Sequence, residues 1–167
     1  MATLTTARRS TERGQAVIEL ALTLPLLLIV VFGIIDFGFM FQRYEAVTNA
    51  AREGARLGAL VPRPINVAVA GSYTKQNAED RALAYLDASG LNGTAHTCVT
   101  GAVVGGTRCA LMTTSTVPVT GSTLTVDQVT MIVEYDHEYQ FVGPIMNLFG
   151  GGMGTIRLRA TSIMRHE

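Results

Sequence analysis

The feature that most constrains the fold of this sequence is an apolar run near its N-terminus, which begins directly after a single glutamate. No residue from Leu20 to Ile35 is charged, and the apolar character continues from Phe37 to Phe41. A helix needs roughly 20 apolar residues to cross the hydrocarbon core of a bilayer, and residues 17–37 supply that length. We therefore expect one membrane-spanning helix. A carboxylate at the edge of such a span costs about 2.5 kcal/mol or more, which marks Glu19 as a functional residue.

A cleaved secretory signal is the alternative explanation of this run. The apolar core of a signal peptide is usually only about 7–15 residues long and ends in small residues at the cut site. Here the run is longer and continues into helix-forming sequence, which favours a retained anchor. The chain has 167 residues and no net charge, so we expect one modest domain besides the anchor and no nucleic-acid partner.

Arginines do not decide the orientation of the span, because as many precede it as follow it within a comparable distance. The two cysteines are more informative. A disulfide between Cys98 and Cys109 would contribute about 3 kcal/mol and would require an oxidising compartment, whereas two unpaired thiols are the alternative. With the short N-terminal tail, this favours a cytoplasmic N-terminus and a C-terminal domain on the outer side of the membrane.

Helical sequence extends beyond the span to about Leu60, which predicts a rod of about 65–70 Å over residues 15–60. The segment Met1–Arg13 is polar and basic, and we expect it to be a flexible tail. Pro25 lies inside the helix and removes one backbone donor, which predicts a kink or a locally loosened turn near Ala21–Pro25.

Small residues recur every four positions along the outer half of this helix and allow the close approach of a second backbone. The stripe is either a packing groove for another subunit or the surface under the protein's own sheet. It consists of Ala46, Ala50, Gly54 and Gly58.

Four charged residues on the helix are further candidates. Glu53 and Arg56 have the spacing of an i,i+3 pair. Arg52 and Arg56 are either interface residues or part of a solvated face. Asp36, near the outer end of the span, is a solvated interfacial acid or the partner of Arg43 or of another helix.

We expect the remaining residues, 61–167, to form an outer domain. Pro62 and Pro64 end the rod, and Asn66–Thr74 is a connector. Lys75–Ser89 predicts a short helix that ends at Gly90. Alternating apolar residues over 129–141 and 155–164 predict strands, and His96–Val104 with Thr107–Ser115 predicts a hairpin around Gly105-Gly106. The fold class is therefore α+β, with an antiparallel sheet of about four strands. The inward residues expected on the short helix are Ala78, Ala82, Leu83 and Leu86.

The sequence offers little for catalysis. His137 alternates faces with Asp136 and Glu138 on its strand, and no nucleophile is placed to complete a triad. His96, Cys98 and Cys109 lack the paired spacing of a zinc site, so a disulfide is the better interpretation. The glycines of Gly150–Gly154 precede a strand and predict a turn. We expect no enzyme, no cofactor and no metal.

Cleavage after Gly14 would leave Gln15 with a free α-amine, one helical turn from Glu19. Such an amine has a reference pKa of about 7.7 and is mostly cationic at neutral pH. It would compensate a carboxylate in lipid, and if it came from a neighbouring subunit it would fix the axial register between two helices.

This N-terminus resembles that of type IV pilin-like proteins, in which a prepilin peptidase cleaves after glycine and the fifth mature residue is glutamate. With Leu24-Pro25-Leu26 and with Ala50-Ala51-Arg52-Glu53-Gly54-Ala55-Arg56, it is more closely similar to the TadE-like family of minor pseudopilins. The short major pilins usually carry tyrosine where this chain has Leu20, and they lack a large outer domain. Both differences agree with a minor subunit.

The resemblance implies a non-enzymatic component of the tight-adherence (Tad, or Flp) pilus, needed for pilus assembly and adhesion. Residues 1–14 would be the leader, and the chain would reside in the inner membrane or enter the pilus. The implied partners are the membrane, other pilin and pseudopilin subunits in a hetero-oligomer, the assembly platform and the prepilin peptidase. The alternative is a single-pass anchored ectodomain that binds a ligand or surface without a filament.

Overall fold

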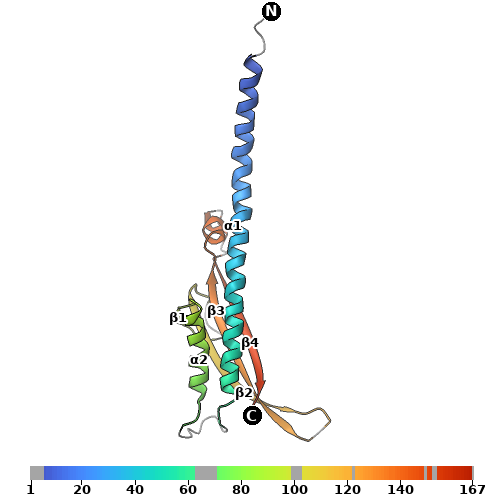
Figure 1. Cartoon of the computed structure of the whole chain (residues 1–167), viewed down its shortest axis with the longest axis vertical. Coiled ribbons are helices and arrows are strands. Elements are labelled where there is room, and N and C mark those ends of the chain that lie inside the picture. The colour runs from blue at the N-terminus through green and yellow to red at the C-terminus, as the bar shows by residue number, and fades with distance from the viewer. Residues whose placement is uncertain are drawn as a thin grey trace, which may run out of the picture.

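The structure, a computed structural model, describes residues 6–62, 71–98, 103–121, 123–148, 150–151 and 154–166, with the backbone alone for residues 6–13. Figure 1 shows a long helix whose C-terminal half packs against a smaller α+β domain. The predicted fold class is confirmed. In chain order the elements are α1 (Thr6–Gly58), α2 (Lys75–Ala88), β1 (Thr94–Ala95), β2 (Thr107–Pro118), β3 (Thr125–Glu138), α3 (Val142–Leu148) and β4 (Thr155–Arg165).

Helix α1 continues through Pro25 and is about 80 Å long. Its C-terminal end at Gly58 is close to the predicted end. Its N-terminal end differs from the predicted one, because the backbone is already helical at Thr6. The expectation of a flexible tail is therefore wrong over residues 6–13. Adding residues to a formed helix avoids the cost of nucleation, so a polar flank without apolar periodicity can still be helical. Pro64 and most of the predicted connector lie outside the described residues.

Helix α2 forms where the sequence predicts it. The Thr74 side chain accepts a hydrogen bond from the backbone N–H of Asn77 at 3.2 Å, and the Asn77 side chain accepts one from the backbone N–H of Thr74 at 2.9 Å. This capping box satisfies two donors of the first turn. Gly90 follows the helix with a φ of 76°, a left-handed conformation that glycine adopts without strain. Ala78, Ala82 and Leu86 are buried as predicted, and Leu83 is half-buried.

The sheet is mixed, with the order β1-β2-β3-β4. The pairs β2–β3 and β3–β4 are antiparallel as predicted, but β1 pairs with β2 in parallel, so the predicted hairpin is wrong. The turn expected to close that hairpin is attached to β3 instead. The backbone N–H of Val104 and the hydroxyl of Thr107 donate to the carboxylate of Asp136 at 2.9 and 3.0 Å. Residues 99–102 of the predicted first arm lie outside the described residues.

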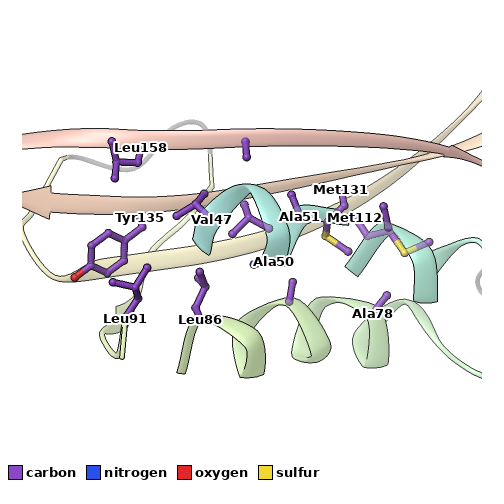
Figure 2. Packing of buried hydrophobic residues seen from close by; sticks show 14 of the residues in the cluster. Val47, Ala50, Ala51, Ala78, Leu86, Leu91, Met112, Met131, Tyr135 and Leu158 are labelled. Atoms are coloured by element: carbon purple, nitrogen blue, oxygen red, sulfur yellow. The ribbon is translucent and has the colours of Figure 1, made fainter. Parts of the chain in front are cut away.

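Helices α1 and α2 lie on the same face of the sheet and share one apolar core with it (Figure 2). The period-two alternation of β3 places every second residue on this side, as predicted. Small residues of both helices allow their backbones to approach. The core includes Val47, Ala50, Ala51 and Ala55 of α1, Ala78, Ala82 and Leu86 of α2, and Met112, Val129, Met131, Val133, Tyr135, Leu158 and Ala160 of the sheet.

Candidate membrane and assembly interface

The N-terminal half of α1 carries an uncovered apolar surface. Every residue from Gly14 to Val31 is exposed, and large apolar side chains such as Leu22 and Leu26 are 74% and 68% accessible. Among the described residues, one helix, over Gly14–Gly58, is long and apolar enough to cross a membrane by length and composition. Since so much apolar area is rarely left in water, this surface requires lipid or other helices around it.

Glu19 lies on this uncovered surface together with Gly14 and Gln15. Its side chain is exposed, and among the side chains that the structure describes none pairs with its carboxylate. Gln15 and Glu19 are separated by one helical turn and therefore point in similar directions. Thr23 donates a hydrogen bond to the Glu19 carbonyl oxygen at 2.9 Å, which satisfies the Thr23 hydroxyl on the helix itself. The Glu19 carboxylate is thus available to a partner from outside the described chain.

Asp36 is the first residue along α1 that the domain buries. It is 1% exposed, so the expectation of a solvated acid is wrong. Its carboxylate accepts hydrogen bonds from the backbone N–H groups of Gln140, Phe141 and Val142, at 3.2, 3.0 and 2.7 Å. These donors precede and open α3, so Asp36 caps a helix from more than a hundred positions away in the sequence. This intramolecular contact replaces the predicted pair with Arg43 or with another helix.

Helix α3 was missed because the alternation in this region predicted a strand through Phe141. The strand ends instead at Glu138, and the chain turns onto α1. The rings of Phe32 and Phe141 are stacked with centroids 5.0 Å apart. Pro144 lies in the first turn of α3, where its missing N–H has no helical acceptor to lose. Gly143-Pro144 after an apolar strand was the available signal for this turn.

Arg43 binds His137 rather than Asp36. Its Nη1 lies 2.6 Å from Nδ1 of His137, which is fully buried. A guanidinium can only donate, so His137 accepts at Nδ1 and is neutral. Burial and then the charge of Arg43 lower the pKa of His137 below 6.5, and the charge of Asp36 opposes them. The pair connects the end of β3 to α1 just beyond the exposed segment.

We expect the domain to lose stability as the pH falls below about 6.5. Because the pKa of His137 is lower in the folded chain, the unfolded chain binds the proton first, so this contribution is complete above pH 6.5 and declines below it. Urea unfolding at pH 7.5 and 5.5 measures the loss. His137→Gln, which keeps a neutral acceptor for Arg43, should reduce this loss of stability. An equal loss in wild type and variant would contradict the assignment.

The stripe of small residues is covered by the protein's own domain, so its interpretation as a groove for another subunit is wrong. Ala50 is fully buried, and Gly54 and Gly58 are buried as well. A Cβ atom at Gly54 would lie 3.0 Å from both Cβ of Ala82 and Cε of Met131. One at Gly58 would lie 2.9 Å from Cγ1 of Val129. The helix packing predicted there is packing within the chain, and Ala46 is half-buried at its edge.

The predicted Glu53–Arg56 pair is confirmed, with Nη2 of Arg56 3.0 Å from Oε1 of Glu53. Arg81 of α2 binds the same carboxylate at 3.0 Å. The hydrogen bonds from Arg56 and Arg81 outweigh burial and lower the pKa of Glu53 to about 2. Arg52 and Arg56 are both exposed, so their predicted role as interface residues stays open beside the solvated alternative.

The face of the sheet away from α1 carries an ionic cluster that sequence reasoning missed. Glu134 and Asp136 alternate with the apolar residues of β3 and are nevertheless only 1% and 0% exposed. Arg157 binds Asp136 through Nε and Nη2 at 2.7 and 2.8 Å, and Nε of Arg159 lies 3.6 Å from Glu134. Arg157 and Arg159 alternate along β4 with the same period as the two acids along β3. That matching period was the available signal.

The predicted disulfide between Cys98 and Cys109 is confirmed, and it borders this cluster. His96, Cys109 and Glu134 bring one nitrogen, one sulfur and one oxygen atom within 4.8 Å of one another. Because the sulfur of Cys109 is bonded to Cys98, it is not a thiolate and cannot serve as a metal ligand of that kind. His96 instead places Nε2 3.3 Å from Oε2 of Glu134.

These observations define a class of protein: an α+β domain on the C-terminal half of a single helix whose other half is capable of spanning a membrane. The family model of the TadE-like protein matches residues 14–56, about a quarter of the chain. The resemblance to the TadE-like family is confirmed over that segment, and it points to a function related to Tad pili. No curated protein and no solved structure matches the chain.

Proposed function

We propose that this protein is a minor pseudopilin of a tight-adherence pilus, anchored in the inner membrane by α1 with its α+β domain outside. It supports pilus assembly and surface adhesion by packing against other pilin and pseudopilin subunits, and it is not an enzyme. The observation that supports this most directly is Glu19 on the uncovered apolar helix, inside the segment that resembles TadE-like proteins. The disulfide agrees with an oxidising location for the domain.

The covered stripe limits where assembly contacts can form. Since Ala50, Gly54 and Gly58 are covered by α2 and the sheet, the apolar surface that α1 offers to partner helices includes the exposed segment, residues 14–31. In that segment Glu19 is a charge among apolar side chains, and its burial between helices is favourable only opposite a cation. A prepilin peptidase that cuts after Gly14 would supply one, the α-amine of Gln15 on a neighbouring subunit. The assembly platform would recruit the chain through the same register.

We expect Glu19→Ala to remain inserted in the membrane but to lose its pilus partners. Removing one member of a buried ion pair costs about 3–5 kcal/mol, so recovery of partner subunits with the tagged protein should fall at least about tenfold. Leu22→Ala is the matched control, because it removes apolar area from the same exposed segment and leaves the charge. The readouts are membrane fractionation, co-purification and piliation of cells.

Normal piliation and co-purification of the Glu19→Ala protein would contradict the proposal. That result would favour the alternative, an anchored ectodomain that binds a ligand or surface independently of a filament. N-terminal sequencing of the wild-type chain from the same cells tests the processing step, for which Gln15 should be the first residue.

A further inference from the structure

The apolar surface of this protein does not end with α1. Residues 139–156 contain no charged residue, and within them Leu148 of α3 is 83% exposed and Phe141 is 39% exposed. A short helix on the surface of a water-soluble domain normally turns charged or polar side chains outward. The exposed Leu148 of α3, and the exposed Phe141 directly before it, therefore require an explanation of their own.

Helix α3 is placed at the end of the domain that points toward the membrane-capable half of α1. Figure 1 shows it as the short orange helix beside α1, beyond the end of the sheet and on the side of the N-terminal half. The Phe32–Phe141 stack and the hydrogen bonds to Asp36 fix it alongside residues 32–36. Phe141, directly before α3, thus extends the uncovered apolar surface of α1 toward this helix.

The length of α1 determines the depth at which α3 lies. The stretch from Val17 to Val31, in which every residue is exposed, covers only about 22 Å at 1.5 Å per residue, whereas the hydrocarbon core is about 30 Å thick. To cross the bilayer, α1 has to remain in the hydrocarbon until about Asp36. Phe141, stacked on Phe32 one turn earlier, is then at the same depth.

The burial and the hydrogen bonds of the Asp36 carboxylate agree with this depth. A carboxylate at the outer edge of the hydrocarbon is costly, and this one is shielded from its surroundings and receives hydrogen bonds from three backbone N–H groups. The same bonds satisfy donors at the start of α3, which in lipid would have no water to bind.

We propose that α3 lies in the outer interfacial layer of the bilayer that α1 crosses, with Leu148 and Phe141 in contact with lipid. This inference rests on the membrane anchoring in the proposed function. Lipid is the occupant because the surface adjoins the anchor, lacks charge and lies at the outer edge of the hydrocarbon. The α+β domain is consequently held directly on the membrane rather than on a free stalk, with the exposed segment of α1 entirely below it.

Depth-dependent quenching in vesicles tests the proposal. Leu148→Cys in the full chain is labelled with the fluorophore NBD and reconstituted into phosphatidylcholine vesicles that contain doxyl-labelled lipid. The native cysteines form a disulfide and do not react. Leu26→Cys, 68% exposed in the span, is the positive control, and Ile163→Cys, 58% exposed on β4, is the matched apolar control away from the membrane.

The expected result is that NBD at 148 loses most of its emission, as it does at 26, while NBD at 163 keeps it. Quenching at 26 without quenching at 148 would overturn this proposal and leave the anchor intact, and an unquenched but blue-shifted signal at 148 would show that protein covers α3 instead. No quenching at any position would overturn the membrane anchoring itself.

Discussion

Asp136→Ala is expected to lower the free energy of unfolding of the α+β domain by about 3–5 kcal/mol, the usual cost of removing one member of a buried ion pair. Asp136 has no exposed surface and binds both Nε and Nη2 of Arg157. It also accepts from the backbone of Val104 and the hydroxyl of Thr107. The substitution therefore removes the acceptor that the Arg157 guanidinium and the Val104 amide share, and it releases the turn that leads into β2.

The electrostatics of Asp136 agree with this expectation. Burial raises the pKa of Asp136, but the hydrogen bonds from Arg157, Val104 and Thr107 outweigh it and hold the pKa below 3.8. Its contribution to stability is thus complete above pH 3.8 and is lost as the pH falls through the lower folded value. At neutral pH the whole effect of the substitution should be visible.

Urea unfolding of the full chain in detergent, followed by circular dichroism, measures the change. Asp136→Asn keeps the shape without the charge and should fall between wild type and Asp136→Ala. Asp80→Ala is the matched control, because Asp80 is an exposed aspartate on α2 and its removal should cost about 0.5 kcal/mol or less. If Asp136→Ala were no more destabilising than Asp80→Ala, the ionic cluster would not hold the sheet together.

Gly54→Leu is expected to destabilise the domain by about 3 kcal/mol, because a side chain there enters a fully packed core. Already the Cβ atom would lie 3.0 Å from the Cβ of Ala82 and 3.2 Å from the carbonyl oxygen of Ala78, both on α2. The backbone of α2 cannot yield without separating the two helices. The same unfolding measurement quantifies the loss.

Gly38→Leu on the same helix is the control for this substitution. A Cβ at Gly38 meets nothing within 4 Å, so leucine there should be neutral or stabilise the helix by up to about 1 kcal/mol. Equal stabilities of the two leucine variants would contradict the packing described here. A stable Gly54→Leu protein that failed to recruit pilin partners would restore the subunit-groove interpretation of the stripe.

Local patterns were sufficient for much of the fold. The length of the apolar run predicted α1, the spacing of inward apolar residues with Gly90 predicted α2, and the alternation over 129–141 and 155–164 predicted the strands β3 and β4. Each of these signals depends on the preference of a short segment for one backbone geometry. The prediction of a strand through Phe141 was wrong, because the backbone N–H groups after Glu138 turn toward the carboxylate of Asp36 on α1.

The sequence by itself determined the anchor-capable helix, the candidate glycine and glutamate on it, the cysteine pair and the α+β class, because length, spacing and periodicity are properties of contiguous residues. Only the tertiary structure decided which surface covers the stripe of small residues, that Asp36 caps α3, and that Glu134 and Asp136 are buried against arginines. Those outcomes depend on pairs such as Asp36 and Phe141, 105 positions apart. Whether a small residue or a carboxylate meets water, lipid or protein is set by the partner that folding brings to it, and no local pattern encodes that partner.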